Sequence, residues 1–565
     1  MSEHSSGRHH VARSGFFAGL HPGMGMAAKG MIAFFVIFTI LNLELASGLY
    51  KAVRAWIEGW FGWYYILLLI GVMFFCFWLM LSRHGRLRLG DDDSRPEFRN
   101  FSWFAMLFSA GIGVGILFFG VAEPIFYFDN SGAFGYPNNP HADMAGHLDM
   151  DMMRARDAMR VAFFHWGFHG WALYVLVGLC LAYFGFRKKL PLTMRSTLYP
   201  LIGERIYGPW GHLIDLLAVF GSVFGIATSL GLGSTQIATG MNVLFGLEVT
   251  LTLKIVLIVI VSIIATASTT VSGVARGIRF ISEWNIWLSI LLLAAFVVIG
   301  PGKWLMAFFI TSMGDYVWNF ITMGFWVATE EPDIAWQGGW TIFYWGWWIA
   351  WAPMVGVFIA RISYGRTIRE FMIGVLCVPS VAVFFWLCIF GGSAIWQELH
   401  MAGGPAAAGG AGIIETVRNW ELPSALYGTI GNIGASSWMG DMSWTTWPLS
   451  LLATVLLVSW FVTSADSGTL VITTMLAMGD VNPPNKFRVI WGAGIGATAI
   501  ALLMSGGLNA LQTALMSTAF PISFLIIAMV WGLAKSLHED SSAAPARAPA
   551  ETLLDGTHLT QNLPA

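Results

Sequence analysis

The residues of this sequence most able to do chemistry are tryptophans. Five occur within twelve positions: Trp340, Trp345, Trp347, Trp348 and Trp351. On a helix of 3.6 residues per turn, the last three lie within an arc of about 100°. An indole face attracts a cation through its quadrupole, and cages of rings suit quaternary ammonium groups, which have no hydrogen to donate. The spacing therefore indicates a binding face for a methylated organic cation.

A second aromatic cluster, HWGFHGWALY, begins at residue 165. On one helix, Trp166, Trp171 and Tyr174 share an arc of about 140°. Two helices that present such faces to each other could enclose a cage. Tryptophan is also common in the aromatic belts of membrane proteins, which sit at the ends of spans. Trp348 and Tyr174 lie well inside their predicted spans, but the pattern alone leaves both interpretations open.

Ionisable residues within the apolar segments are few. His165 and His169 are four positions apart, which is ligand spacing for zinc, but no third ligand is apparent. A membrane-embedded enzyme would need a metal set or a nucleophile–base pair, and only these histidines hint at one. We therefore expect no enzyme activity. Glu123 precedes Pro124, and we expect it to end its span and hydrogen bond or cap there.

The elements that must position these residues are membrane-spanning helices. Hydrophobic residues make up 56% of the chain and charged residues 11%, and the mean hydropathy is +0.67, which excludes a soluble globular enzyme. Runs of about 20 apolar residues match a bilayer core of roughly 30 Å. We expect an all-α polytopic membrane protein with twelve transmembrane helices. Their approximate bounds are 29–50, 60–82, 102–128, 158–185, 212–246, 252–272, 281–300, 340–362, 367–395, 449–478, 486–505 and 508–534.

The charges predict the orientation of the chain in the membrane. Basic residues collect in alternate turns between spans: Arg83, Arg86, Arg88, Arg95, Arg99, Arg187, Lys188, Lys189, Arg195, Arg205, Arg276, Arg279, Arg361, Arg366, Arg369, Lys486 and Arg488. By the positive-inside rule, these turns and both termini are cytoplasmic. We expect a cytoplasmic tail at 1–28, a membrane domain at 29–535, and a second cytoplasmic tail at 536–565. The polar start leads into a full-length span, so we expect no cleaved signal peptide.

Glycine interrupts two of the predicted spans. In FSAGIGVGILFFGVAEP, Gly111, Gly113 and Gly115 alternate with larger residues, and the tryptophan segment contains Gly346 and Pro353. A broken helix frees backbone carbonyls, which in lipid must face protein, water or an ion. Close helix packing of the small-xxx-small type is the alternative. Paired broken segments, five spans apart, are the best sequence pointer to the central site of a transporter. The segment 303–335 is too broken to span, and we expect a helix lying along the outer surface.

Four stretches resemble the signature of the betaine/carnitine/choline transporter (BCCT) family. They are AGIGVGILFFGVAEP (110–124), HWGFHGWALY (165–174), WTIFYWGWWIAWAPMVGVFIARISYGRTIREF (340–371) and VTSADSGTLVITT (462–474). The resemblance covers all twelve predicted spans in order. It implies a LeuT-type fold with a 5+5 inverted repeat in spans 3–7 and 8–12, preceded by two N-terminal spans. It also implies uptake of a trimethylammonium-type solute, often by a homotrimer.

The resemblance also assigns residues to the site. The substrate cage of the family corresponds to Trp347, Trp348, Trp351, Trp166, Trp171 and Tyr174. Trp340 and Trp345 match aromatic positions that flank the permeation path. Carnitine-type members carry tyrosine at the position of Trp351, so tryptophan favours a betaine-like ligand. We expect a substrate carboxylate to meet backbone N–H groups at a half-helix start near Gly111, Gly113 and Gly115.

A coupling ion needs oxygen ligands. Thr463 and Ser464 match side-chain ligands of the family's sodium site, and the carbonyls of Ser109, Ile112 and Trp460 would complete about five oxygens. The structural alternative for the two hydroxyls is hydrogen bonding between helices. No cofactor other than sodium as coupling ion is expected.

Departures from the family pattern bear on coupling. Gly115 stands where proton-coupled choline members carry aspartate, and the span 212–246 lacks the arginine of sodium-independent carnitine exchangers. Met354 replaces the phenylalanine that sodium-coupled betaine carriers have near one of two sodium sites. We expect sodium symport of an onium solute, glycine betaine first, across the bacterial cytoplasmic membrane. Choline or dimethylsulfoniopropionate uptake, carnitine-type exchange and proton coupling remain alternatives. The expected partners are the solute, sodium and lipid, with no nucleic acid.

Overall fold

The computed structural model describes residues 11–111, 113–129, 151–272, 274–401, 412–480 and 482–543. For residues 109–111, 266–272, 274–279, 508 and 541–543 it describes the backbone alone. Within these ranges the protein is built from helices, and its extended pairing is an isolated bridge between Arg88 and Thr367. The expected all-α class is therefore confirmed.

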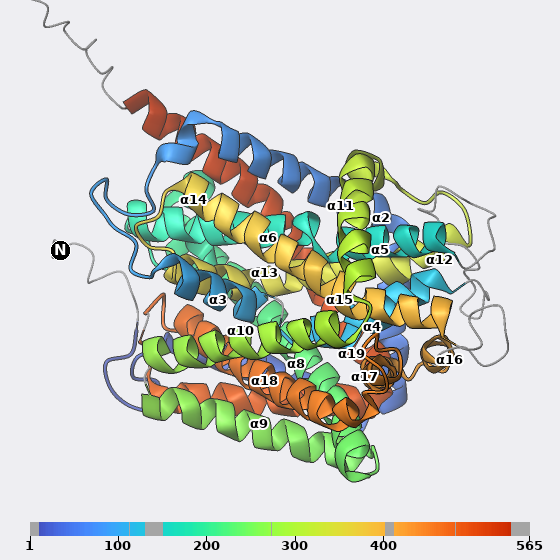
Figure 1. Cartoon of the computed structure of the whole chain (residues 1–565). Helices are drawn as coiled ribbons and strands as arrows, with labels where there is room; N and C mark the ends of the chain where they lie inside the picture. The colour runs from blue at the N-terminus through green and yellow to red at the C-terminus, as the bar shows by residue number, and fades with distance from the viewer. Residues whose placement is uncertain are drawn as a thin grey trace, which may run out of the picture.

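Figure 1 shows the helices in chain order, coloured from blue at the N-terminus to red at the C-terminus. Their bounds are α1 Pro22–Leu41, α2 Leu43–Leu81, α3 Asn100–Gly111, α4 Gly115–Phe128, α5 Met152–Trp166, α6 Phe168–Ala182, α7 Tyr199–Ile202, α8 Pro209–Phe245, α9 Leu251–Ser272, α10 Val274–Ile299, α11 Gly302–Phe325, α12 Asp333–Gln337, α13 Phe343–Arg361, α14 Ile368–Met372, α15 Val378–His400, α16 Ile413–Arg418, α17 Leu422–Ala435, α18 Thr446–Leu476 and α19 Asn485–Ala543. Turns of 3₁₀ type cover Arg83–Arg86, Met194–Leu198, Gly203–Tyr207 and Ser443–Thr445, and π-helical turns cover Tyr183–Arg187, Gly338–Ile342 and Ile373–Cys377.

Ten helical segments of the described residues are long and apolar enough to cross a membrane, and two shorter apolar helices accompany them. The shorter pair, Gly115–Phe128 and Leu251–Ala265, fall in two of the predicted spans. The protein is thus a polytopic helical membrane protein, although the predicted number of twelve spans is not confirmed.

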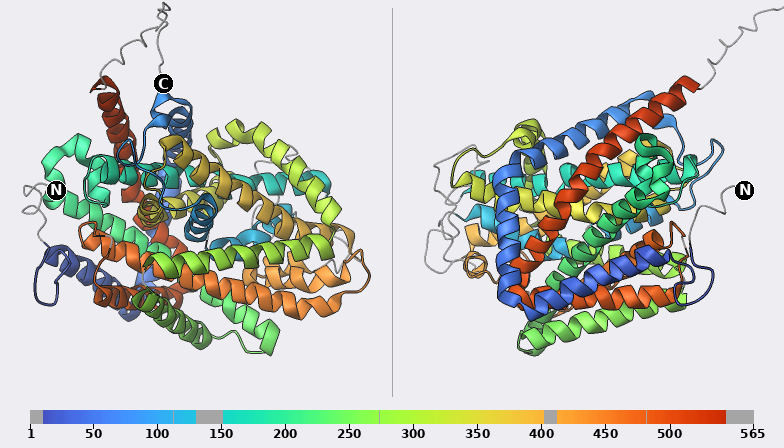
Figure 2. Two further views of the ribbon diagram at one scale, coloured as in Figure 1. Left: turned by 60° about the vertical axis from the view of Figure 1, so that its left-hand side comes forward. Right: turned by 180° about the vertical axis from the view of Figure 1, so that it is seen from behind.

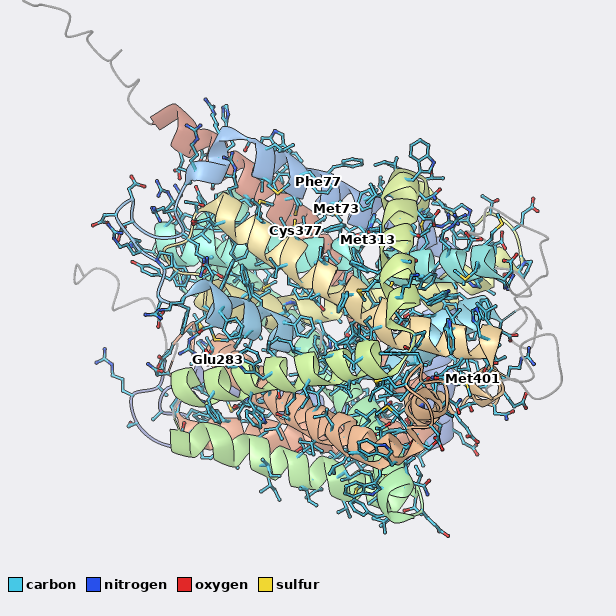
Figure 3. All side chains as sticks on the ribbon, in the orientation of Figure 1. Met73, Phe77, Glu283, Met313, Cys377 and Met401 are labelled. Atoms are coloured by element: carbon cyan, nitrogen blue, oxygen red, sulfur yellow. The ribbon has the colours of Figure 1, made fainter. Side chains whose placement is uncertain are left out.

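The first predicted helix break is confirmed. α3 ends at Gly111 and α4 begins at Gly115, and between them Gly113 has φ +53°, a left-handed conformation that glycine adopts readily. Ser102 of α3 donates a hydrogen bond of 2.7 Å to Glu283 of α10, which is labelled in Figure 3. The two halves of this segment are therefore held by different neighbours.

The second predicted break is wrong. α13 runs without interruption through Gly346 and Pro353, and the irregular turn lies before it, at Gly338–Ile342. A Cβ at Gly346 would lie 2.2 Å from the Sδ of Met516 in α19. Gly346 therefore serves close helix packing, which is the alternative that small residues in membrane helices always offer.

The fourth predicted span is two helices rather than one. α5 ends at Trp166 and α6 begins at Phe168, because Gly167 has the non-helical angles φ −97° and ψ −139°. Trp166 and Tyr174 consequently lie on different helices, and the predicted shared arc is wrong. Near the C-terminus, by contrast, the two predicted spans form α19, which is kinked at Gly506 and Gly507.

Helices α4, α6 and α13 form the interior of the bundle. Every residue of α4 is buried, as are all residues of α13 from Phe343 to Ala360. In the most apolar stretch of Pro22–Leu41 only 28% of residues are buried. Helices that are apolar on all sides are either buried in protein or face lipid, so the outer helices present a lipid-facing surface around a protein core. Figure 2 shows these outer helices from two further sides.

Helix α11 differs from the others in direction. It runs steeply across α10 and α15, whereas most long helices lie closer to one common direction (Figure 1). It covers most of the predicted outer-surface segment 303–335, while 326–332 is not helical. A helix is therefore confirmed there.

The basic turns gather at one end of the bundle. Arg88 donates to the carbonyl of Gly365 at 2.8 Å, and Arg187 pairs with Asp92 at 2.8 Å. Lys188 pairs with Asp540 near the end of α19. The start of α1 and the end of α19 lie toward the same end (left in Figure 1). The bundle thus has one strongly basic end.

Candidate substrate-binding site

One face of α13 carries a stack of aromatic rings. Tyr344 stacks on Trp347 at 6.1 Å between centroids and on Trp348 at 6.0 Å, with ring planes tilted by 17° and 30°. Trp347 and Trp348 lie 5.5 Å apart and nearly parallel, and Trp351 meets Trp347 edge-on at 6.4 Å. All four rings are buried in protein rather than directed at lipid. A belt at a membrane interface would not be covered in this way.

Rings from α5 and α6 close on this face. Trp166 contacts Trp347 and Trp348 at 6.1 and 5.2 Å, and both contacts are close to perpendicular. Tyr174 contacts Trp348 at 6.0 Å, and Trp171 lies against Tyr174 at 5.4 Å. The structure therefore brings the six predicted cage residues into one connected cluster, which we call the cage cluster. Their part in binding stays a prediction.

Glycines from three helices make room for the cage cluster. A Cβ would lie 3.0 Å from Cη2 of Trp347 if added at Gly115, 2.7 Å from Nε1 of Trp348 at Gly170, and 2.4 Å from Cδ1 of Trp351 at Gly225. These separations are shorter than an ordinary van der Waals contact. The glycines on α4, α6 and α8 thus fix where three of the indoles sit. Gly115 was a predicted site residue, whereas Gly170 and Gly225 were missed.

Sequence reasoning also missed Tyr344 and predicted the role of Glu123 only in part, as a residue that would cap or hydrogen bond. Tyr344 precedes Trp347, Trp348 and Trp351 by three, four and seven positions, so helical periodicity alone would have placed it on the same face. Glu123 does not cap its helix, because α4 continues through Pro124 to Phe128. The signal for Glu123 was a lone acidic residue in a fully apolar stretch, which is costly in a membrane and marks a functional site.

The Glu123 carboxylate lies at the centre of a buried hydrogen-bond network. Its Oε1 accepts a bond of 2.9 Å from the Tyr127 hydroxyl and lies 2.9 Å from Nδ1 of His165. Its Oε2 accepts bonds from Nε1 of Trp166 at 2.6 Å and from the Tyr344 hydroxyl at 2.5 Å. One carboxylate therefore contacts a residue of the cage cluster and the tyrosine stacked on it.

The two predicted gate aromatics have different surroundings: Trp340 lies in the π-helical turn before α13, and Trp345 lies on α13. Trp340 contacts Phe126 at 4.5 Å and Tyr127 at 5.1 Å, near the end of α4. Trp345 stacks on His169 at 5.9 Å with a 24° tilt, away from the cage cluster. Trp340 thus lies against the end of α4, whereas Trp345 packs between α6 and α13, and the part of both as gates stays a prediction.

The histidine pair is divided between separate environments. His165 approaches Glu123 through Nδ1 and the Thr341 hydroxyl through Nε2 at 3.0 Å. His169 packs its ring between Trp345 and Phe320. In the described part of the chain, no three histidine, cysteine, aspartate or glutamate side chains gather as metal ligands do. The geometry therefore shows no zinc site formed by the pair among these residues.

The predicted sodium ligands lie partly within the described residues. Ser464 of α18 has a buried hydroxyl without a hydrogen-bond partner, 2.9 Å from where a Cβ of Gly113 would be. Thr463 donates its hydroxyl to the carbonyl of Trp460 at 2.9 Å. Ile112 lies outside the described residues, and Ser109 is described only as backbone of α3. The structure thus places Ser464 at the helix break, as a coupling site there would require.

Known proteins resemble this chain along nearly its whole length. Residues 25–542 match the family described as BCCT, betaine/carnitine/choline family transporter. A probable glycine betaine transporter of Desulfitobacterium hafniense is 42% identical over 90% of this chain and 95% of its own. The glycine betaine transporter OpuD of Bacillus subtilis is 40% identical over 89% of this chain and 92% of its own. The high-affinity choline transport protein of Escherichia coli is 37% identical over 92% of this chain and 72% of its own.

The matches agree with the geometry in pointing to transport. The buried aromatic cluster, the broken helix beside it and the lipid-facing exterior are features of a solute carrier, and the family match covers all of them. The chain therefore belongs to the betaine/carnitine/choline transporter family and is a multi-pass membrane transporter, not an enzyme.

Proposed function

We propose that this protein imports a methylated onium solute, glycine betaine first, by sodium symport across the bacterial cytoplasmic membrane. The observation that carries the proposal is the cage cluster, six aromatic residues from α5, α6 and α13 buried in the interior of the bundle. Ring faces can replace the hydration shell of a trimethylammonium group, which cannot be hydrogen bonded.

The other end of the solute meets a helix start. α4 begins at Gly115, directly beside Trp347 and Trp166. The backbone N–H groups of a first helical turn and the positive end of a helix dipole at this position favour an anion. A betaine carboxylate there would lie one short methylene from its ammonium group in the rings. The arrangement therefore suits a small zwitterion.

Sodium coupling rests on the break between α3 and α4. The Ser464 hydroxyl, the Thr463 hydroxyl and carbonyls freed at the break would supply oxygen ligands to a hard cation. A cation bound there would tie α18 to the break that carries the substrate site. Binding of sodium would thereby favour the arrangement that binds substrate, which is the basis of symport.

The outer end of the site carries a polar latch. Arg418 of α16 makes two hydrogen bonds to Asp129 at the end of α4, of 2.6 and 3.1 Å. The hydrogen bond to Asp129 raises the pKa of Arg418, so the guanidinium group stays charged. Together with Trp340 and Phe126, this latch would close the site on the side away from the basic end. Access would then alternate between the two ends.

The membrane setting follows from the same features. The basic end supports a cytoplasmic position for that face and for both termini, by the positive-inside rule. The exposed apolar side chains of α11, such as Trp318 and Ile310, offer a surface for a homotrimer contact or for lipid.

Choline is the second candidate solute. The cage cluster recognises only the methylated cationic head, and choline and dimethylsulfoniopropionate carry comparable heads. One relative is named a choline transport protein, and others are named for glycine betaine. The lack of a carboxylate at Gly115 favours betaine over choline in this chain.

Uptake by purified protein in proteoliposomes tests the proposal. Radiolabelled betaine, choline, carnitine and dimethylsulfoniopropionate would be offered with an imposed inward sodium or proton gradient. We expect betaine uptake driven by sodium. Uptake that ignores sodium and follows an inward proton gradient would refute the coupling, and failure of every onium solute would refute the substrate class.

A further inference from the structure

Glu123 is a buried carboxylate with an unusual set of neighbours. Its side chain has no solvent exposure, and four donors or donor-capable groups surround its two oxygens: the Tyr127 hydroxyl, His165 Nδ1, Trp166 Nε1 and the Tyr344 hydroxyl. Within the described residues, its ion-pair partner is the imidazole of His165, at 2.9 Å, which is charged only when protonated. No permanent cation neutralises it there.

The network reaches both walls of the cage cluster. Trp166 of α5 and Tyr344 of α13 donate to the same oxygen, Oε2, so one atom of α4 fixes both rings. Tyr344 in turn stacks on Trp347 and Trp348. The Trp348 indole donates a bond of 2.9 Å to the backbone carbonyl of His165. The carboxylate therefore lies one indole away from the proposed onium position.

A neutral acceptor could bind these donors with a smaller free-energy cost of burial than a carboxylate. Burying a carboxylate far from water is costly unless an opposite charge compensates it. Near the bilayer centre, such residues usually serve substrate or ion binding. A bound onium head would be the compensating charge that the buried network lacks. Coulomb attraction across one ring remains considerable, because protein and lipid screen poorly.

We propose that Glu123 is a specificity-determining positioning residue: its carboxylate holds Trp166 and Tyr344 in place and provides the counter-charge that selects a cationic head over a neutral one of the same shape. This inference rests on the proposed transport of onium solutes. It adds a distant charge to the cation–π attraction of the rings. The rings alone already prefer a trimethylammonium group to a tert-butyl group, and the carboxylate increases that preference.

Substitution by glutamine separates charge from geometry. In Glu123→Gln, the amide oxygen can accept from Trp166 and Tyr344, while the amide N–H₂ donates to His165 Nδ1 and the Tyr127 oxygen. The hydrogen bonds survive with a change of imidazole tautomer, and only the negative charge is lost. Glu123→Asp keeps the charge with a shorter reach, and Tyr344→Phe removes one donor but keeps the carboxylate.

The probe pair is glycine betaine and 3,3-dimethylbutanoate, the carbon isostere that lacks the positive charge. Inhibition of radiolabelled betaine binding to the purified protein gives the selectivity ratio of the two ligands. We expect Glu123→Gln to weaken betaine binding about tenfold, equivalent to about 1.4 kcal/mol, and not to weaken binding of dimethylbutanoate, an anion that the carboxylate repels. The ratio should be kept in Glu123→Asp and in Tyr344→Phe.

Two results would overturn the inference. An unchanged ratio in Glu123→Gln would show that the charge is irrelevant and the residue merely structural. Loss of the betaine-to-dimethylbutanoate selectivity in Glu123→Asp would also overturn the inference, because this variant keeps the charge. That test remains informative if the glutamine variant is not recovered from the membrane. If the unaltered protein binds betaine no better than its isostere, the proposed function itself fails, and that outcome is distinct from both.

Discussion

Substitution of Gly225 by alanine should displace a ring of the cage without touching the ligand. The new Cβ would lie 2.4 Å from Cδ1 and 2.6 Å from Nε1 of Trp351. Carbon atoms in contact lie about 3.5–4.0 Å apart, so the indole must retreat by about 1 Å. Trp351 is buried and meets Trp347 edge-on, so a shift of its indole disturbs the cage cluster.

The expected free-energy changes indicate that Gly225→Ala affects betaine binding more than folding. Overpacking costs about 1–3 kcal/mol, and alanine in the middle of α8 returns about 1 kcal/mol of helix propensity relative to glycine. The fold should therefore survive. Loss of one well-placed ring removes about 1–2 kcal/mol of desolvated cation–π attraction. The betaine Kd should rise by about 5- to 30-fold.

Binding of radiolabelled betaine to purified protein measures the effect. Gly71→Ala is the matched control, because Gly71 lies on α2 and a Cβ there meets nothing within 4 Å. The control should leave Kd unchanged. A Gly225→Ala protein whose Kd stays within twofold of the unaltered protein would refute the assignment of Trp351 to the ligand.

Three further changes test other parts of the site. Trp348→Leu should abolish measurable betaine uptake, whereas Trp531→Leu, at an indole 70% exposed on α19, should not; equal uptake by both would contradict the cage. Ser464→Ala should raise the sodium concentration for half-maximal uptake by about tenfold through loss of one oxygen ligand; an unchanged sodium dependence would exclude this hydroxyl. Asp129→Asn should weaken the contact with Arg418, a partly exposed ion pair that contributes at most about 1 kcal/mol. Amide hydrogen exchange in α16 should become about fivefold faster; unaltered exchange would show that this ion pair does not stabilise α16.

The sequence predicted the helical class and the tryptophan face of α13 well because both rest on strong local patterns. Long apolar runs require helices in lipid, and tryptophans at helical spacing share a face. The break at Gly113 was predictable because alternating glycines weaken a helix. The placement of α3 still depends on partners such as Glu283, which no local pattern indicates.

The wrong predictions concern features that are determined by packing between helices distant in the sequence. Gly346 and Gly113 look alike in sequence, but Gly346 is small because Met516 of α19 packs against it. Gly167 separates α5 from α6, but apart from the glycine itself no local sequence signal indicated a break there. Glu123 was expected to end its span because Pro124 follows it, but proline inside a buried helix is tolerated in membranes and α4 continues; the expected hydrogen bonding of Glu123 is confirmed. Partners far along the chain determine each of these cases.

The claim that indole faces hold the onium head is tested most directly by fluorinating one indole. Fluorine withdraws charge from the ring face and weakens a cation–π contact with little change of shape. Mono-, di- and trifluorotryptophan placed at Trp348 should raise the betaine Kd step by step, with log Kd linear in the number of fluorines. A betaine Kd that is the same for every member of the series would contradict the account.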